Sequence, residues 1–149
     1  MIGYRSIGYS EINFLLNSEN PVYGCFKYSK LEESGCTLPY GAVSFFIDNF
    51  KWHDQSHKVD IKVNLPDDAQ IGVATYYATP NFGDTKIFTG RRGSVEYKVE
   101  EAYVRCYEPK DIIEINLNGL FASHYIESAV KPFCEKYGIK LIWENKEIC

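Results

Sequence analysis

The sequence predicts one α+β domain spanning residues 1–149, and three observations favour it. The length of 149 residues is enough to bury one hydrophobic core. The chain has 45% hydrophobic and 24% charged residues, which is typical of a soluble globular protein. Short segments of alternating apolar and polar residues indicate roughly seven or eight strands, with about two to four helices between them in mixed order. This order favours mainly antiparallel sheets with flanking helices.

The first two elements are expected close to the N-terminus. Residues 4–7 read as a short strand. Ser10 is expected to cap a helix over residues 11–17, because serine side chains accept the unpaired N–H groups of a first turn. Ile12 and Leu15 share one face of that helix and predict the side that packs on the core.

The middle of the chain reads as a series of strands. Residues 22–40 carry no clear pattern, and residues 48–57 are expected to form a short helix or turn. Alternating or continuous apolar runs predict strands at residues 42–47, 58–65, 71–78, 86–88, 95–99, 100–107 and 112–117.

The C-terminal part is expected to be a helix and strand that cap the sheet, over residues 118–149. Helical spacing of apolar residues predicts a helix over residues 123–137, in which Pro132 implies a kink or an earlier break. Gly138 is suited to the position after the helix end, which favours a left-handed backbone. Residues 139–143 then predict a closing strand.

Charge and cysteine content limit the classes of function. The net charge of -4 argues against a general nucleic-acid-binding protein, although Arg91 and Arg92 form a local basic spot. Five cysteines, without C-x-x-C spacing, indicate free thiols in a reducing compartment. His53 and His57 are four apart but lie in no metal-site motif, so no metal is expected. We therefore expect a cytoplasmic protein, or one delivered into the cytoplasm of a target cell.

Residues 100–112 are the stretch around which the chain is organised. Two carboxylates, Glu100 and Glu101, open it, and Pro109 closes it. A period of two predicts two faces. The small apolar face suits the core and consists of Ala102, Val104 and Cys106. The polar and aromatic face suits a cleft or solvent and consists of Glu101, Tyr103, Arg105 and Tyr107.

Three patterns occur in order along the chain. The first is Tyr4-Arg5-Ser6 before the N-terminal helix. The second is the apolar strand around Ser44. The third is Thr75-Tyr76-Tyr77-Ala78-Thr79-Pro80-Asn81-Phe82, followed by the strand of Glu101. Together they resemble the cholera-toxin-like mono-ADP-ribosyltransferases, whose signature is an arginine, a serine strand and a late glutamate. The resemblance covers about residues 3–115 and implies two packed, mainly antiparallel sheets around an NAD cleft.

The resemblance implies an enzyme that moves ADP-ribose from NAD to a macromolecular acceptor, expected to be a protein, and releases nicotinamide without a metal. Arg5 would hold the phosphates of NAD, for which a planar guanidinium is well suited. Ser44 would orient the glutamate. Glu101 would stabilise the positively charged sugar formed as the base leaves. The residues expected to contact NAD are Arg5, Ser6, Ser44, Phe45 and Phe46.

Two departures from the family pattern qualify the expectation. The family often has Ser-Thr-Ser where this chain has Ser44-Phe45-Phe46, so one phenylalanine could stack on nicotinamide or both could be core. Arginine-modifying members have Glu or Gln at the position of Val99, so arginine is not the expected acceptor. If Glu100 is catalytic instead of Glu101, that position is Lys98. The acceptor loop is residues 82–98, with candidate contacts Phe88, Arg91, Arg92, Tyr97 and the adjoining Val99.

Other functions stay open at this point. A catalytically degenerate member would bind a protein or ligand without turnover, which the missing hydroxyls and Val99 favour. An NAD glycohydrolase would use water as the acceptor. An unrelated interaction domain would use its many tyrosines as a contact face. The acidic balance disfavours a DNA or RNA acceptor.

Overall fold

The structure of the chain is a computed structural model that describes residues 1–23, 42–47, 52–53, 59–80, 86–88, 95–119 and 121–149. Within these ranges, side chains are described for residues 1–23, 42–47, 59–75, 98–119 and 121–149. The candidate acceptor contacts Arg91 and Arg92 lie outside the described residues.

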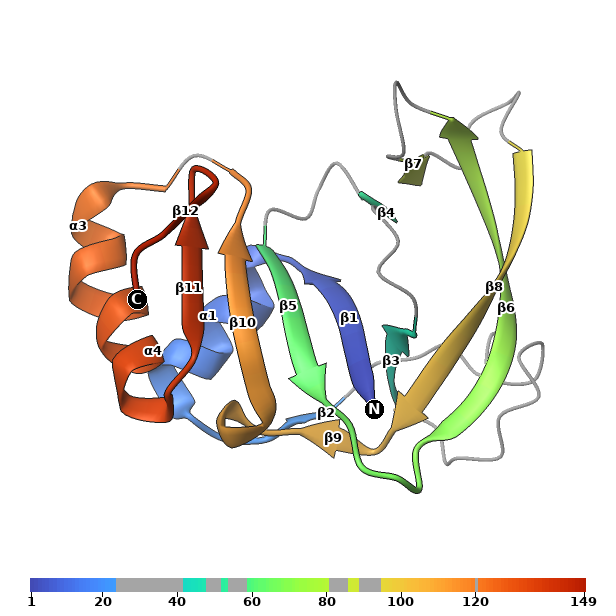
Figure 1. Ribbon diagram of the computed structural model, residues 1–149, viewed down its shortest axis with the longest axis horizontal. Coiled ribbons are helices and arrows are strands. Elements are labelled where there is room, and N and C mark those ends of the chain that lie inside the picture. The colour runs from blue at the N-terminus through green and yellow to red at the C-terminus, as the bar shows by residue number, and fades with distance from the viewer. Residues whose placement is uncertain (24–41, 48–51, 54–58, 81–85, 89–94, 120) are drawn as a thin grey trace.

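The described elements confirm the α+β class (Figure 1). The strands are β1 Ile2–Ile7, β2 Val22–Tyr23, β3 Val43–Phe46, β4 Trp52–His53, β5 Val59–Asn64, β6 Gln70–Pro80, β7 Lys86–Phe88, β8 Val95–Val104, β9 Cys106–Tyr107, β10 Ile112–Leu117, β11 Lys140–Trp143 and β12 Lys146–Glu147. The helices are α1 Tyr9–Ser18, the short 3-10 helix η1 Pro109–Asp111, and a C-terminal helix made of α3 Ser123–Tyr125, the π-helical η2 Ile126–Val130 and α4 Lys131–Tyr137.

The described strands form one mixed sheet and a small second one. The main sheet has the order β12-β11-β10-β5-β1-β3-β8-β6-β7-β4, and β2 pairs with β9 separately. Its pairs are antiparallel except β10 with β11 and β4 with β7. Instead of two large sheets, there are two parts of one sheet, joined where Tyr4 of β1 pairs with Phe46 of β3. Figure 1 shows the helices beside the β10–β11 part and the long β6–β8 ribbon at the other end.

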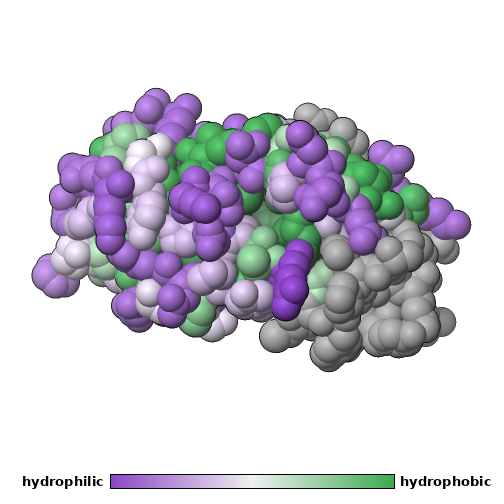
Figure 2. Space-filling model, turned by 90° about the horizontal axis from the view of Figure 1, so that it is seen from below, coloured by the Kyte–Doolittle hydropathy of each residue, from purple (hydrophilic) through white to green (hydrophobic). Residues whose placement is uncertain are grey.

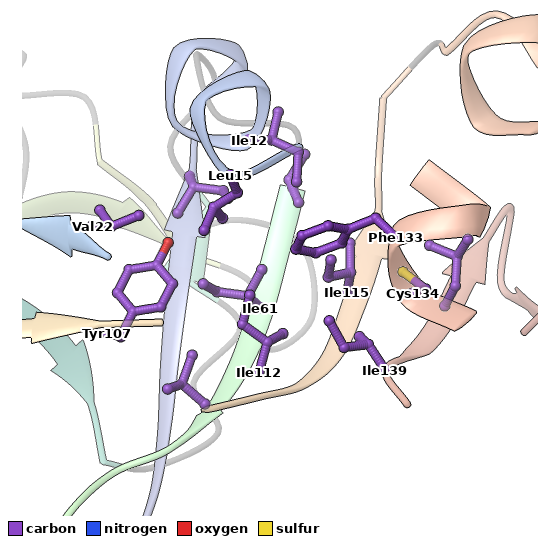
Figure 3. Packing of buried hydrophobic residues seen from close by; sticks show 14 of the residues in the cluster. Ile12, Leu15, Val22, Ile61, Tyr107, Ile112, Ile115, Phe133, Cys134 and Ile139 are labelled. Carbon is purple, nitrogen blue, oxygen red and sulfur yellow. The ribbon is translucent and has the colours of Figure 1, made fainter. Parts of the chain in front are cut away.

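The main core lies between the sheet and its helices. Ile12 and Leu15 of α1 are fully buried, which confirms the predicted packing side of that helix. Figure 3 shows them above Ile61, and Phe133 of the C-terminal helix belongs to the same buried cluster. Gly3 of β1 allows Leu65 to pack closely against that strand, since a Cβ at Gly3 would lie 2.6 Å from Leu65 Cδ1. Burying large apolar side chains of this kind contributes about 1.5–3 kcal/mol each.

Of the three predictions about the helices and their ends, two are confirmed and one is wrong. The N-cap of α1 is Gly8, and no side-chain cap bond is described there, so the expected Ser10 cap is wrong and Ser10 lies in the first turn. The predicted break near Pro132 is confirmed as the π-helical segment directly before α4. Proline has no N–H to donate to the preceding turn, which favours such an irregularity. Gly138 has φ 66°, as expected for a residue that ends a helix in the left-handed conformation.

The predicted alternation over residues 100–107 is confirmed only as far as Val104. The strand is interrupted at Arg105, which is exposed, and β9 then pairs with β2 instead of continuing in the main sheet. Beyond the interruption the faces are exchanged. Tyr107 is 1% exposed and lies in the core, whereas Cys106 is half-buried, so both assignments were wrong.

The surface mixes hydrophilic and apolar side chains, as Figure 2 shows from below. Within the described ranges, no helix is long and apolar enough to cross a membrane. Cys106, Cys134 and Cys149 carry free thiols, whereas Cys25 and Cys36 lie outside the described residues.

Candidate functional site

The three signature residues lie on three adjacent strands. Arg5 is on β1, Ser44 on β3 and Glu101 on β8, and these strands are consecutive in the sheet. The register places Phe46 opposite Glu101, and Ser44 opposite Tyr103. The topology therefore brings residues from positions 5, 44 and 101 into one region of the sheet.

The strand register divides these residues between the two faces of the sheet. Paired residues share a face, and alternate residues along a strand share a face. The side that we call the Glu101 face carries Tyr4, Ser44, Phe46, Glu101 and Tyr103. Arg5, one residue after Tyr4, lies on the opposite side, which α1 covers and which we call the helix face. The structure thus brings together Ser44 and Glu101 but not the guanidinium of Arg5.

Arg5 belongs to a polar cluster on the helix face. Its Nε donates to Glu11 Oε2 at 3.0 Å and its Nη2 to Glu11 Oε1 at 2.8 Å, a two-pronged ion pair with α1. Its Nη1 donates to the backbone carbonyl oxygen of Ser44 at 3.2 Å. The side chains of Arg5 and Glu11 are 22% and 18% exposed. Arg5 therefore links β1, α1 and β3, and already binds a carboxylate where an NAD phosphate was expected.

Tyr107 completes this cluster. Its hydroxyl donates to Glu11 Oε2 at 2.6 Å, and Figure 3 shows it directed toward α1. Burial of the ring, together with the negative charge of Glu11, raises the pKa of Tyr107 well above its ordinary value near 10. The phenol therefore stays protonated and remains a donor throughout the neutral range.

Glu101 is a buried carboxylate on the other face. It is 1% exposed, and the hydroxyl of Tyr103, a residue with no exposed surface, donates to its Oε2 at 2.6 Å. Val99 is 4% exposed and lies on the same side of β8, two residues before Glu101. Burial of an ionised carboxylate is costly unless hydrogen bonds compensate it, so a buried glutamate on a strand marks a candidate functional site.

The remaining predicted NAD contacts are divided in the same way. Phe45 is 1% exposed and packs edge-on against Tyr107, with ring centroids 5.6 Å apart, so it is a core residue. Phe46 is half-buried on the Glu101 face. The hydroxyl of Ser6 donates to Asp60 of β5, on the side of β1 away from β3.

The expected acceptor contacts are described only in part. Phe88 ends β7 and Tyr97 lies in β8, but their side chains are outside the described set. Val99 is buried and so presents little surface to a macromolecule. Glu100 is exposed and lies on the opposite side of β8 from Glu101. Among the side chains that are described, no group of three or more metal-ligating residues occurs.

Two partners in these clusters were missed in the sequence. Glu11 falls in the first turn of the predicted helix and was given no role in the site, although the connection between β1 and α1 brings it back to Arg5. The opposite charges six residues apart were the available signal. Tyr103 was placed beside Glu101 by alternation, which the structure confirms, but no bond between them was expected.

Comparisons of the chain with models of protein families, with curated proteins and with solved structures found no match in any of the three. The case for a function therefore depends on the residues and contacts described above.

Proposed function

We propose that this protein is a mono-ADP-ribosyltransferase that moves ADP-ribose from NAD to a macromolecular acceptor, expected to be a protein, and releases nicotinamide. The observation that carries the proposal is the Glu101 carboxylate. It is buried and bonded to Tyr103, and it lies on the same face of adjacent strands as Ser44. The finer expectation of an NAD cleft belongs to this proposal, and the cleft would lie on the Glu101 face.

The proposed chemistry needs an anion at the sugar. The bond between C1′ of the ribose and the nicotinamide nitrogen breaks, and its electron pair leaves with nicotinamide. The sugar gains positive charge, which a fixed carboxylate stabilises more in the transition state than in the ground state. The acceptor then forms its bond to C1′ and loses a proton. Glu101 supplies the carboxylate, and Ser44 a hydroxyl one strand away.

Arg5 has an indirect role in this proposal. Its guanidinium lies on the helix face, where it is bound to Glu11. Its hydrogen bond to the carbonyl oxygen of Ser44 holds β3 from the helix face of the sheet. The role that the resemblance gave Arg5, holding the phosphates of NAD, would require the guanidinium to leave Glu11.

A second candidate is a catalytically degenerate member of the same family that binds a ligand or protein without turnover. Two observations favour it: Arg5 is bound to Glu11, and Glu101 has only 1% of its surface exposed. In the variant with water as the acceptor, the protein would be an NAD glycohydrolase.

The test is release of nicotinamide from NAD, together with transfer of label from NAD into proteins of a cell lysate. We expect Glu101→Gln to lower the rate by about 10²-fold or more, because the amide keeps the shape but removes the charge. The matched control is Glu100→Gln, which removes the same charge from the neighbouring, exposed position on the other side of β8. Its rate should stay within about twofold of wild type.

The other possible outcomes of this test distinguish between the candidate functions. No turnover of NAD by either wild type or Glu101→Gln would contradict the enzyme proposal, whereas equal, measurable rates would contradict the catalytic role of Glu101. Tight NAD binding without turnover would support the degenerate candidate. A large loss in Glu100→Gln alone would identify Glu100 as the catalytic carboxylate. Nicotinamide release without labelled protein would favour the glycohydrolase.

A further inference from the structure

We propose that Tyr103 is the positioning residue of the Glu101 carboxylate, holding it in the orientation in which it meets the sugar. The inference rests on the proposed function. It goes beyond the resemblance, which assigned orientation of the glutamate to Ser44.

The geometry of the pair supports this role. Tyr103 and Glu101 are two residues apart on β8, so their side chains emerge on the same face. The O–H of Tyr103 donates to Glu101 Oε2 at 2.6 Å, a short bond of the kind formed with a charged acceptor. Both side chains are fully buried, and β8 lies between β3 and β6. Because β8 is paired with a strand on each side, the backbone from which the Tyr103 side chain extends is held in place.

The neighbouring strands shape the site around this pair. Tyr103 lies between Ser44 of β3 and Gln70 of β6 in the register, and Glu101 lies between Phe46 and Gly72. Gly72 contributes no side chain beside the carboxylate. The ring of Tyr103 is thus flanked by polar residues, whereas the carboxylate has an aromatic ring on one side and a glycine on the other.

The bond serves orientation more than assembly. A hydrogen bond between residues two apart on one strand joins no separate elements, because the strand already fixes their separation. What it restricts is the rotation of the glutamate side chain. A displacement of about 1 Å from the productive geometry can lower a rate by about 10²-fold, so restricting this rotation has a direct effect on turnover.

The experiment compares Tyr103→Phe with wild type in the nicotinamide-release assay, with rates normalised to the folded fraction measured by circular dichroism. We expect kcat to fall by about 10- to 100-fold while KM for NAD stays within about twofold, since the ring remains and only the hydroxyl is lost. In Glu101→Gln/Tyr103→Phe, the loss should not exceed that of Glu101→Gln alone, because residues that act as a unit are not additive.

The matched control is Tyr137→Phe. This variant removes a tyrosine hydroxyl of the C-terminal helix that also donates to a glutamate, Glu19 Oε2 at the end of α1, at 3.0 Å. Its kcat should equal that of wild type. Replacement of Tyr103 by 3-fluorotyrosine provides a second variant that keeps the shape and the donor. Because the hydroxyl still holds the carboxylate in place, kcat should stay within about twofold of wild type with KM unchanged.

The proposal is overturned if Tyr103→Phe keeps the kcat of wild type per folded molecule and only its stability falls. A rise in KM with unchanged kcat would overturn it too, because it would mean that the hydroxyl binds NAD in the ground state. Turnover that is lost in Glu101→Gln but kept in Tyr103→Phe rejects the positioning role alone. No turnover by wild type rejects both this role and the proposed function.

Discussion

Two pairs of glutamate and tyrosine, one fully buried and one partly buried, lie on opposite faces of the same sheet, and they differ in what they connect. Both tyrosines donate to a carboxylate at 2.6 Å. Glu11 and Tyr107 are 96 residues apart, and Arg5 joins them, so the bonds hold α1, β1 and β9 together. Glu101 and Tyr103 are neighbours on one strand. The same bond therefore secures the fold on the helix face, whereas on the Glu101 face it orients a side chain.

The largest loss of stability is expected from breaking the helix-face cluster at its cation. Arg5→Met leaves the partly buried Glu11 without its guanidinium, which should lower the free energy of unfolding by about 2–4 kcal/mol in urea denaturation. The control is Lys140→Met, which removes a half-exposed cation 3.9 Å from Glu114 and should cost less than about 1 kcal/mol. A loss below about 1 kcal/mol in Arg5→Met would mean that the helix-face cluster does not hold the fold.

A smaller loss, with a characteristic pH dependence, is expected for Tyr107→Phe. At pH 7 the free energy of unfolding should fall by about 1–3 kcal/mol, because Glu11 loses a donor. The folded-state pKa of Tyr107 is raised above the unfolded value near 10, so its contribution is complete below pH 10 and is lost as pH rises further.

The measurement is urea denaturation of both proteins from pH 7 to pH 11.5. The advantage of wild type over Tyr107→Phe should shrink by about 1.4 kcal/mol per pH unit above pH 10. A constant difference across this range would show that the phenol ionises equally in the folded and unfolded states.

The smallest effect on stability is expected for Glu100→Gln. Glu100 is exposed and lies beside Glu101 in the sequence, so it tests whether position along β8 or burial decides the effect. The free energy of unfolding should change by less than about 0.5 kcal/mol. A shift of more than about 1 kcal/mol in its urea denaturation would show that this charge, too, supports the fold.

The sequence predicted these two faces unequally. Alternation correctly placed Glu101 with Tyr103, and the apolar residues of 112–117 located β10, although a register shift between Ile112 and Glu114 leaves Ile113 exposed. Alternation could not predict which side of β1 faces the core. Gly3, Arg5 and Ile7 share one side of that strand, and the other side is equally mixed, so the pattern does not show which side meets the core. The contact with Glu11 shows that Arg5 lies on the helix face.

The misplacement of Tyr107 has a different cause. Local alternation continued through Arg105, but β9 pairs with Val22–Tyr23, more than 80 residues earlier in the chain. A long-range pairing of this kind leaves no local signal, although it exchanges the faces of every residue after the interruption. The 3-10 helix at Pro109 then leads into β10, which lies where a strand was predicted.

The pairing of Tyr4 with Phe46 has a mechanical consequence. In the described part of the chain it is the one rung between β1 and β3, whereas β1 has six rungs with β5. A force that pulls the two parts of the sheet apart would separate β1 from β3 first, because a single residue pair joins these strands. Phe46 belongs to that residue pair and is also paired with Glu101 of β8. Any tilt of one part of the sheet against the other therefore changes the surroundings of the Glu101 carboxylate first.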